Sequence, residues 1–286
     1  ATRKWSGISE KHGFAQCHHD CKGPEMKDPA IEIHDLTMAY REKPVLWDID
    51  LSIPKGSLCS VIGPNGAGKS TLLGCILGTY KPANGWIKIF DVPRDQSQEL
   101  IGFVPQRESV DWDFPIQVLD VVMMGTYRSL GWFRWPGKAQ RDWAMQCLDA
   151  VGMADFKSRQ IGELSGGQQQ RVFIARALAQ DTKIILMDEP FAGVDAATEE
   201  TIREILIDLK KAQKTVVIVH HDLQTVEDFF DHVLLLNLRL VAAGPTATTF
   251  TRENLLRTYG GKLTLLDEAA EAVRRIRSGR STGKRG

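Results

Sequence analysis

The sequence predicts an α/β fold, in which the strands of a mostly parallel β-sheet alternate with helices and one helical segment is inserted. Short apolar runs of strand length, such as those at 58–62, 183–188 and 215–219, are separated by segments with helical periodicity. Between about 107 and 165 the pattern changes to helix-like segments around an aromatic middle, which holds four of the seven tryptophans. Strands that alternate with helices are typical of a parallel sheet covered by helices.

The expected elements follow one another in a simple order. A run with period-two alternation begins at Ile31, as in a half-buried strand, and a helical pattern begins at Lys69 after a glycine-rich turn. The expected strands cover 31–36, 45–53, 58–62, 86–90, 101–105, 183–188, 215–219 and 232–236. The other expected helices cover 116–127, 138–151, 165–180 and 197–211.

Three parts are expected along the chain. Residues 1–29 mix Gly, Pro, His and charge without an apolar period, which predicts a loose extension. Residues 30–262 form the main domain, with the helical subdomain at about 107–165 inserted in it. Residues 263–286 are expected to form a helix and a basic tail, because the run 267–277 places acidic residues before basic ones, as suits the helix dipole.

The composition is that of a globular protein. The 286 residues include 36 Lys and Arg against 36 Asp and Glu, and 43% are hydrophobic. This composition excludes disordered and fibrous classes, and the balanced charge argues against a dedicated nucleic-acid binder. No run approaches the roughly 18 apolar residues of a membrane span, and residues 1–10 lack the apolar stretch of a signal peptide. The five scattered cysteines fit reduced cytosolic thiols. We therefore expect a soluble intracellular protein, which only a partner could hold at a membrane.

Residues 63–71 read G-P-N-G-A-G-K-S-T and lie between an apolar strand and a helix. Glycines let successive backbone N–H groups point into one cavity at the positive end of the following helix. The lysine supplies a charge for the β- and γ-phosphates, and the hydroxyl after it suits Mg²⁺. A glycine-rich turn that matches by chance is disfavoured by this context. The sequence thus predicts a nucleotide site formed by Gly63, Pro64, Asn65, Gly66, Ala67, Gly68, Lys69, Ser70 and Thr71.

Two adjacent carboxylates, Asp188 and Glu189, follow the apolar strand that ends at Met187. Ligands of open α/β sheets bind at the carboxyl ends of the strands, which is where these side chains are expected. Asp188 can hold Mg²⁺, and Glu189 can orient or deprotonate an attacking water. An acidic turn before Pro190 is the alternative, and the phosphate loop upstream makes it the weaker one.

Residues 164–171, L-S-G-G-Q-Q-Q-R, predict the start of a helix with exposed amides. Ser165 is expected to cap this helix, and Gly166 and Gly167 leave its N-terminal N–H groups accessible. This would be a second anion site, separate from the phosphate loop. A plain Ser-Gly helix start is the alternative.

With these three motifs in this order, the chain resembles the ATP-binding cassette (ABC) ATPases over roughly residues 31–250. L-S-G-G-Q is similar to the family signature. The resemblance implies a P-loop NTPase fold of the ABC type, with an N-terminal antiparallel β portion and a helical insertion. It also implies an ATPase whose hydrolysis of ATP, with Mg²⁺, is coupled to transmembrane transport.

The resemblance assigns further residues by position. Tyr40 matches the aromatic residue that stacks on adenine, and Gln106 matches the glutamine that senses Mg²⁺ and links to the helical insertion. His221 matches the histidine that contacts the γ-phosphate, whereas the neighbouring His220 is not expected to be functional. The loop 192–195 matches the one that touches the opposite subunit. The implied catalytic residues are Glu189, His221, Gln106 and Lys69, and the implied metal ligands are Ser70, Gln106 and Asp188.

The family geometry implies partners, because one chain cannot complete a site. Two domains would clamp two ATP molecules, each between the phosphate loop of one and the signature of the other. The partner's nucleotide would then contact Ser165, Gly166, Gly167 and Gln168. We expect a dimer with a second copy or a related ATPase, integral-membrane permease subunits as further partners and, indirectly, an extracytoplasmic metal-binding protein. The chain itself is expected at the cytoplasmic face of the inner cell membrane, as a peripheral subunit. No nucleic acid is expected.

The segment from Val110 to Gly125, together with F-A-G-V-D at 191–195, resembles ATPases of the manganese, zinc and iron uptake family. ATPases of iron-chelate or cobalamin importers are the alternative, and a soluble ABC ATPase without a transport role is a weaker one. Four aromatic residues of the insertion are either anchors for the permease or part of the core: Trp112, Phe114, Trp132 and Trp135. The string C-H-H-D-C at 17–21 offers zinc ligands but lacks a second Cys/His pair of the usual spacing.

Overall fold

The computed structural model describes residues 29–40, 43–112, 114–130 and 135–260. Most of the expected N-terminal extension, with its C-H-H-D-C string, lies outside these residues, as do Trp132 and the whole of 263–286.

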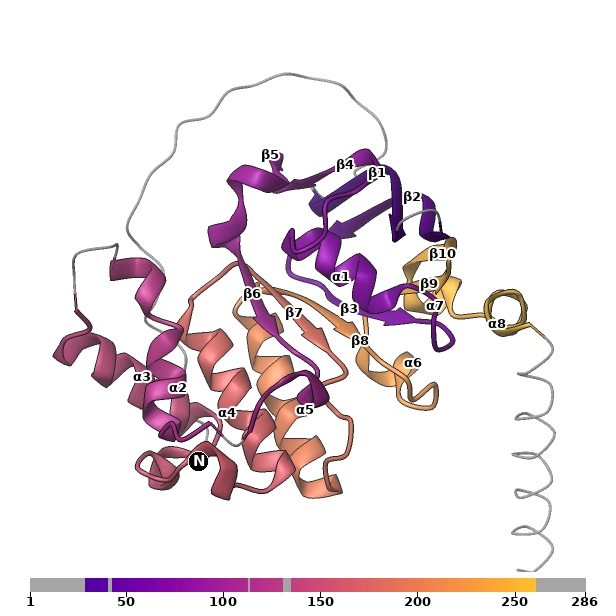
Figure 1. Cartoon of the computed structure of the whole chain (residues 1–286). Helices are drawn as coiled ribbons and strands as arrows, with labels where there is room; N and C mark the ends of the chain where they lie inside the picture. The colour runs from indigo at the N-terminus through magenta and orange to yellow at the C-terminus, as the bar shows by residue number, and fades with distance from the viewer. Residues whose placement is uncertain (1–28, 41–42, 113, 131–134, 261–286) are drawn as a thin grey trace, which may run out of the picture.

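A four-stranded antiparallel sheet forms one layer of the molecule. Its strands are β1 (Pro29–Tyr40), β2 (Lys43–Pro54), β4 (Asn84–Ile89) and β5 (Val92–Pro93), in the order β2-β1-β4-β5. Buried and exposed residues broadly alternate along β1 and β2, as they do in a strand that covers a core with one face. The expected antiparallel β portion is confirmed, and Figure 1 shows it above the rest of the fold.

A six-stranded sheet forms the centre, in the order β10-β9-β3-β8-β7-β6. Neighbouring strands are parallel except for the pair β9 and β10. Every residue of β3, β7 and β8 is buried, which explains why these segments read as continuous apolar runs rather than alternating ones. The six strands are β3 (Leu58–Ile62), β6 (Ile101–Val104), β7 (Ile184–Asp188), β8 (Thr215–Val219), β9 (His232–Asn237) and β10 (Arg239–Pro245).

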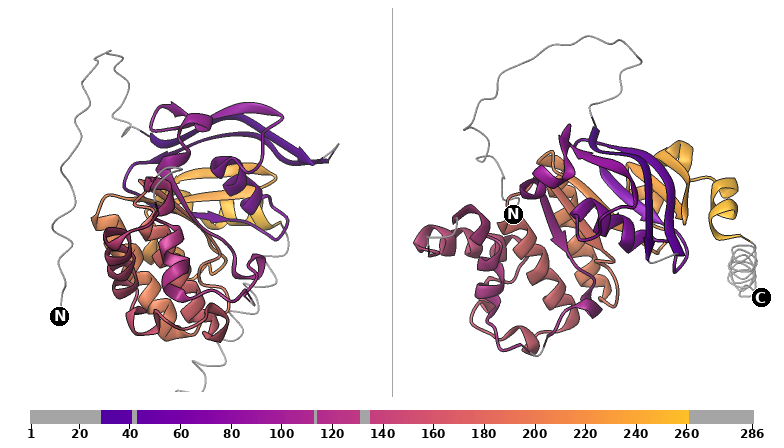
Figure 2. Two further views of the ribbon diagram at one scale, coloured as in Figure 1. Left: turned by 60° about the vertical axis from the view of Figure 1, so that its left-hand side comes forward. Right: turned by 45° about the horizontal axis from the view of Figure 1, so that its top comes forward.

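Two hydrophobic cores cover the two faces of this sheet. On one face, α1 (Lys69–Leu77) buries Leu72, Leu73 and Ile76 in a cluster that also contains side chains of β1 and β2. On the other face, α4 (Gly166–Ala179) and α5 (Ala196–Lys211) pack in a second cluster. The antiparallel sheet therefore lies over α1, and Figure 2 shows α4 and α5 on the opposite side of the central sheet.

The helices expected between 107 and 165 are present as α2 (Val118–Met124) and α3 (Lys138–Ala150), which pack on each other and on α4. The first is shorter than its predicted range of 116–127, because Gln117 is extended and forms a bridge with Gln160. None of the described helices combines the length and apolar character needed to cross a membrane.

The sequence did not predict the short elements at the end of the described chain. Besides β10, these are α6 (Val226–Phe229), α7 (Thr246–Thr249) and α8 (Arg252–Tyr259). The last of them packs on β9 and β10 at the edge of the central sheet.

Candidate functional site

The phosphate-binding loop connects β3 to α1, as predicted. Gly66 and Gly68 have φ angles of 81° and 93°, in the left-handed region that glycine adopts without strain. A Cβ on Gly68 would also come within 2.7 Å of the carbonyl oxygen of Val45, and one on Gly63 within 2.0 Å of that of Leu236. The glycines are therefore required both by the turn and by the backbone packed behind it.

Lys69 lies folded onto its own loop. Its Nζ donates hydrogen bonds to the carbonyl oxygens of Gly63 at 2.9 Å and Pro64 at 3.0 Å. Burial lowers the pKa of Lys69, and the nearby carboxylates of Glu189 and Asp188 act in the opposite direction. The Lys69 ammonium group is thus held by backbone carbonyl oxygens of the loop itself.

An open cavity of about 560 Å³ lies in front of the loop, a size typical of small-ligand sites. Three of the predicted catalytic side chains line it beside the loop, although they come from distant parts of the chain: Gln106, Glu189 and His221. They follow β6, β7 and β8, so the parallel strands deliver them to one sheet edge.

Asp188, the last residue of β7, is only 6% exposed, and its Oδ1 is buried with no hydrogen-bond partner among the described residues. Burial raises the pKa of Asp188, while a hydrogen bond with the Ser70 side chain lowers it. A buried carboxylate oxygen without a partner, beside a hydroxyl, fits the oxygen ligands that Mg²⁺ prefers. The role of Ser70 and Asp188 as Mg²⁺ ligands remains a prediction with which this environment is compatible.

Both carboxylate oxygens of Glu189 have partners. Gln106 Nε2 donates to Oε2 at 3.1 Å, and Nε2 of His221 lies 2.5 Å from Oε1. Glu189 itself has a φ of 50°, which is unusual for a residue other than glycine. Residues in such conformations occur frequently at functional sites. The three residues predicted for catalysis beyond Lys69 therefore form one hydrogen-bonded group.

Tyr40 ends β1 and packs edge-on against Tyr80, with ring centroids 5.6 Å apart. Burial and a hydrogen bond with Tyr80 raise the pKa of Tyr40, and a hydrogen bond with Thr71 lowers it. Thr71 lines the cavity, whereas Tyr40 is not among the residues that line it. Val45 also lines the cavity, although it is not among the predicted site residues, because nothing in the sequence distinguishes it from the other apolar residues of β2.

The signature segment begins α4 as predicted. The Ser165 side chain accepts from the N–H of Gln168 at 3.4 Å, and Gln168 Oε1 accepts from the N–H of Ser165 at 3.0 Å. This reciprocal pair caps the helix. A Cβ on Gly167 would meet the Thr198 hydroxyl at 2.7 Å, so Gly167 permits close packing against α5. Among the described residues, those that line the cavity do not include Ser165, Gly166, Gly167 or Gln168.

The loop 192–195 ends at Asp195, which caps α5 by accepting from the N–H of Thr198 at 2.9 Å. Hydrogen bonds from the Thr198 backbone and side chain lower the pKa of Asp195.

His220, which is not among the predicted site residues, is buried beside aromatic side chains. It is 5% exposed, its Nε2 lies 2.8 Å from the Thr225 hydroxyl, and its ring contacts those of Phe191 and Phe230. Burial lowers the pKa of His220.

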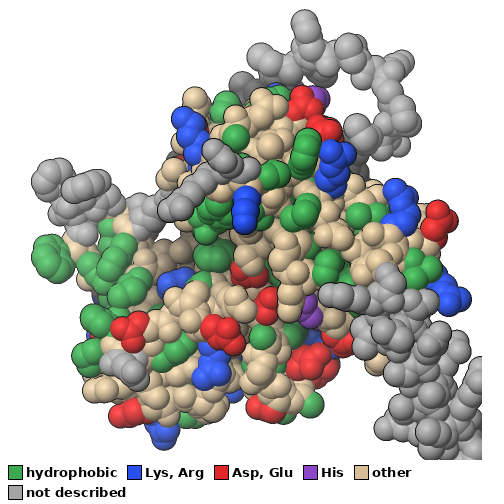
Figure 3. Space-filling view, turned by 45° about the vertical axis from the view of Figure 1, so that its right-hand side comes forward, with side chains coloured by type: hydrophobic (Ala, Val, Ile, Leu, Met, Phe, Trp, Pro, Cys, Tyr) green, Lys and Arg blue, Asp and Glu red, His purple; other side chains and the backbone are tan. Residues whose placement is uncertain are grey.

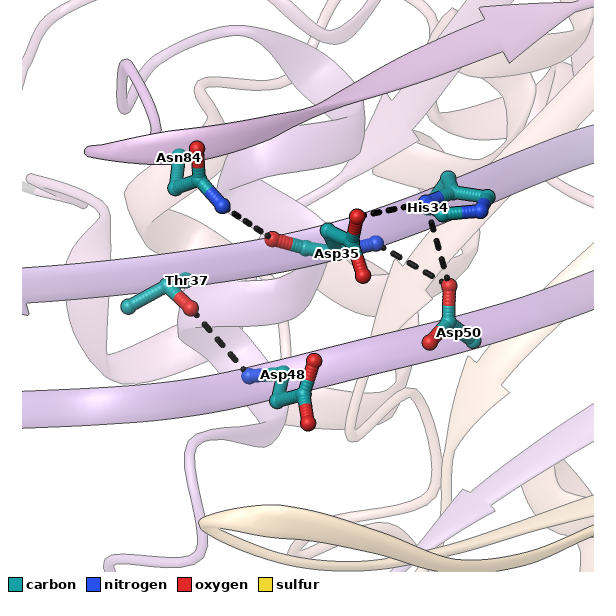
Figure 4. Close-up of polar contacts among 6 residues, drawn as sticks. All are labelled: His34, Asp35, Thr37, Asp48, Asp50 and Asn84. Atoms are coloured by element: carbon teal, nitrogen blue, oxygen red, sulfur yellow. Dashed lines mark hydrogen bonds and ion pairs between the residues drawn. The ribbon is translucent and has the colours of Figure 1, made fainter.

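A second polar group lies on the antiparallel sheet and belongs to a different surface. Nδ1 of His34 lies 3.0 Å from Asp35 Oδ2 and 3.5 Å from Asp50 Oδ1, and the three side chains are exposed (Figure 4). The N–H of Asp35 also donates to Asp50 Oδ1. These groups contact one another at the surface, and none of them lines the cavity of the phosphate loop.

The comparison with known protein families matches residues 46–192 to the ABC transporter family. The chain is 54% identical to the zinc transport system ATP-binding protein TroB of Treponema pallidum, covering 82% of this chain and 88% of that one. It is 56% identical to the manganese transport system ATP-binding protein MntB of Bacillus subtilis, covering 83% and 95%.

Two solved structures are similar over most of the chain. One is a metal-chelate type ABC transporter in an inward-facing conformation, at 33% identity and a TM-score of 0.72, covering 81% of this chain and 88% of that one. The other is the dimer of an ATP-binding cassette in a post-hydrolysis state with ADP and Pi, at 30% identity and a TM-score of 0.68, covering 75% and 98%.

Proposed function

Because the chain belongs to the ABC transporter family, we propose that it is the ATP-hydrolysing subunit of an importer that carries a divalent metal ion, manganese, zinc or iron, through a separate membrane permease. The observation that carries this proposal is that the phosphate loop, Gln106, Glu189 and His221 line the same cavity. This arrangement suits hydrolysis at the terminal phosphate, which needs the phosphates held and a water oriented in line with them.

In the proposed mechanism the N–H groups of the loop and Lys69 hold the phosphates of ATP, and Tyr40 stacks on the adenine. Asp188 and Ser70, with Gln106 nearby, would hold Mg²⁺, which supplies charge neutralisation for the phosphate oxygens. The Glu189 carboxylate orients the attacking water and accepts its proton, and His221 steadies the γ-phosphate. The Gln106 and His221 contacts to Glu189 support these roles, because they hold the carboxylate at the cavity.

A second subunit completes the site in this proposal. The signature residues of α4 do not line the cavity of their own chain, and the similar cassette structure is a dimer. A partner copy, or a related ATPase, would supply Ser165, Gly166, Gly167 and Gln168 to the nucleotide held here. Binding of ATP then favours the closed dimer, and hydrolysis reopens it.

The proposed contact with the permease lies on the helical insertion. An apolar groove of about 320 Å³ is bordered by Trp112, Phe114 and Ile116 and by Phe173 of α4. Trp112 is part of its wall, since its ring packs edge-on against Phe173 at 5.0 Å, whereas Phe114 is 59% exposed. Trp135 is 92% exposed and does not line this groove. We assign the groove to a helix of the permease at the cytoplasmic face of the membrane.

The cargo assignment rests on the relatives. Those named for zinc and manganese transport are 54% and 56% identical, whereas the metal-chelate type transporter is 33% identical. A chelate importer is the second candidate, because the fold of this chain is similar to that of the metal-chelate type transporter, with a TM-score of 0.72. In either case an extracytoplasmic metal-binding protein would deliver the cargo to the permease, without contact with this chain.

The test is the metal content of cells that lack this protein and are resupplied with wild type or Glu189→Gln. A fall in one of manganese, zinc or iron that only the wild type restores supports the proposal and names the cargo. Growth with the metal as a free salt or only as a chelate separates the two candidates. Unchanged metal content under both conditions would exclude both importers.

A further inference from the structure

The turn between β9 and β10 lies directly behind the phosphate-binding loop. The N–H of Leu238 donates to the carbonyl oxygen of Ala67 at 3.0 Å, and Ala67 is 1% exposed. Two residues earlier, the carbonyl oxygen of Leu236 is so close to Gly63 that a Cβ there would come within 2.0 Å of it. The loop therefore rests on residues 236–238, and its position depends on theirs.

This turn is itself held from two sides. The carbonyl oxygen of Leu238 accepts from the N–H of Trp47 in β2 at 2.8 Å. On the other side, Asn237 Nδ2 donates to the carbonyl oxygen of Thr258 in α8 at 2.9 Å. Thr258 is fully buried, and its hydroxyl donates to Asn254 one turn earlier at 2.7 Å, so the acceptor lies in a fixed part of the helix.

Tyr259, the next residue of α8, helps to anchor the last turn of that helix. Its ring packs against the second hydrophobic cluster, the one that holds α4 and α5. The last turn of α8 is thus held against the core and joined to the phosphate-binding loop through Asn237 and the turn between β9 and β10.

We infer that α8 sets the position of the phosphate-binding loop, and that Asn237 is a positioning residue for ATP binding. The inference rests on the proposed nucleotide site and extends it to a helix that does not line the cavity. Phosphate is bound by several N–H groups at once, so a shift of about half an ångström in the loop weakens them together. Asn237 is not assigned to the chemical step.

The test compares three variants of the full chain. Asn237→Asp keeps the size of the side chain and removes the amide donor to Thr258, and Asn237→Ala removes the side-chain contact altogether. Arg257→Ala is the matched control, because Arg257 is an exposed residue of the same helix. For each protein we would measure the dissociation constant of a non-hydrolysable ATP analogue with Mg²⁺, kcat and KM for ATP, and the melting temperature without nucleotide.

Each of the first two variants is expected to raise the dissociation constant about two- to tenfold, the effect of losing one ordinary hydrogen bond. KM should rise with it while kcat stays within about twofold, and the control should match the wild type. A lower melting temperature with an unchanged dissociation constant in both variants would overturn the inference, because it would show a purely structural role. If the wild type itself bound no analogue, the proposed nucleotide site would be wrong instead.

Discussion

Arg107 Nε donates a hydrogen bond to Gln169 Oε1 at 3.1 Å, which joins the residue after Gln106 to the signature helix α4. Gln169 also donates to the carbonyl oxygen of Ile161 at 3.2 Å, and the carbonyl oxygen of Arg107 accepts from the Trp112 indole at 2.9 Å. Trp112 borders the groove assigned to the permease. One short network therefore connects that groove, the signature helix and the glutamine that contacts Glu189.

Replacement of Arg107 should uncouple the groove from the catalytic site. In Arg107→Ala the bond to Gln169 is lost, which removes about 1 kcal/mol of net interaction at this junction. We expect the ATPase rate of the isolated subunit to change less than about fivefold, the factor that corresponds to this loss, while its stimulation by the permease falls further. ATPase assays with and without the permease in vesicles would measure both. Arg141→Ala, on the exposed surface of α3, serves as the control, and equal stimulation of the two variants would contradict the prediction.

Glu189→Gln should separate binding of ATP from its hydrolysis. The amide keeps the size of the side chain but cannot accept the proton of the attacking water, so turnover should fall about 100-fold or more. ATP should still bind, and the variant should accumulate as an ATP-bound dimer that size-exclusion chromatography with light scattering can detect. Hydrolysis at the wild-type rate would show that Glu189 does not have the assigned role.

Asp188→Asn should stabilise the protein without nucleotide and inactivate it. Burial raises the pKa of Asp188, so above the pKa of the unfolded chain the ionised carboxylate opposes folding. The neutral amide removes that cost, and the melting temperature should rise. Loss of the proposed Mg²⁺ ligand should lower the Mg²⁺-dependent ATPase rate by about 100-fold, the order expected when a metal ligand is lost. A less stable variant, or one with normal ATPase activity, would contradict this prediction.

His220 should make the protein less stable in mild acid. Because burial lowers the pKa of His220 in the folded state, the unfolded chain binds a proton more readily. Stability is thus unaffected by this group at high pH and falls as the pH drops through the pKa of the unfolded histidine, about 6.5. Urea denaturation of the wild type and of His220→Gln would measure how the free energy of unfolding of each changes between about pH 8 and pH 5, the range in which histidine titrates. The prediction fails if the two proteins lose stability equally.

The polar group around His34 and the polar group around Lys69 and Asp188 differ in their exposure to solvent. Figure 3 shows acidic, basic and hydrophobic side chains interspersed on one face, in keeping with a chain of balanced charge. The His34, Asp35 and Asp50 network is exposed, whereas Lys69 and Asp188 are each 6% exposed. Their burial beside the phosphate-binding loop is in keeping with the role proposed for the second pair.

The sequence by itself determined the parts of the site that are contiguous. The loop at 63–71 and the cap at Ser165 depend on neighbouring residues, since glycines, a lysine and a capping box act within a few positions of one another. The apolar runs at 58–62 and 215–219 coincide with β3 and β8. A strand that is buried on both faces needs a side chain suited to burial at almost every position, so its sequence alone reveals it.

Only the tertiary structure decided which distant residues meet. The strand order β3-β8-β7-β6 brings Gln106, Glu189 and His221 to one edge, and no local pattern encodes that order without the family resemblance. Val45 looks like an ordinary apolar position and Asn237 like an ordinary turn residue, until packing places one in the cavity wall and joins the other to Thr258 of α8. Local motifs report conformations fixed by neighbouring residues, whereas contacts between remote segments arise from burial shared by the whole core.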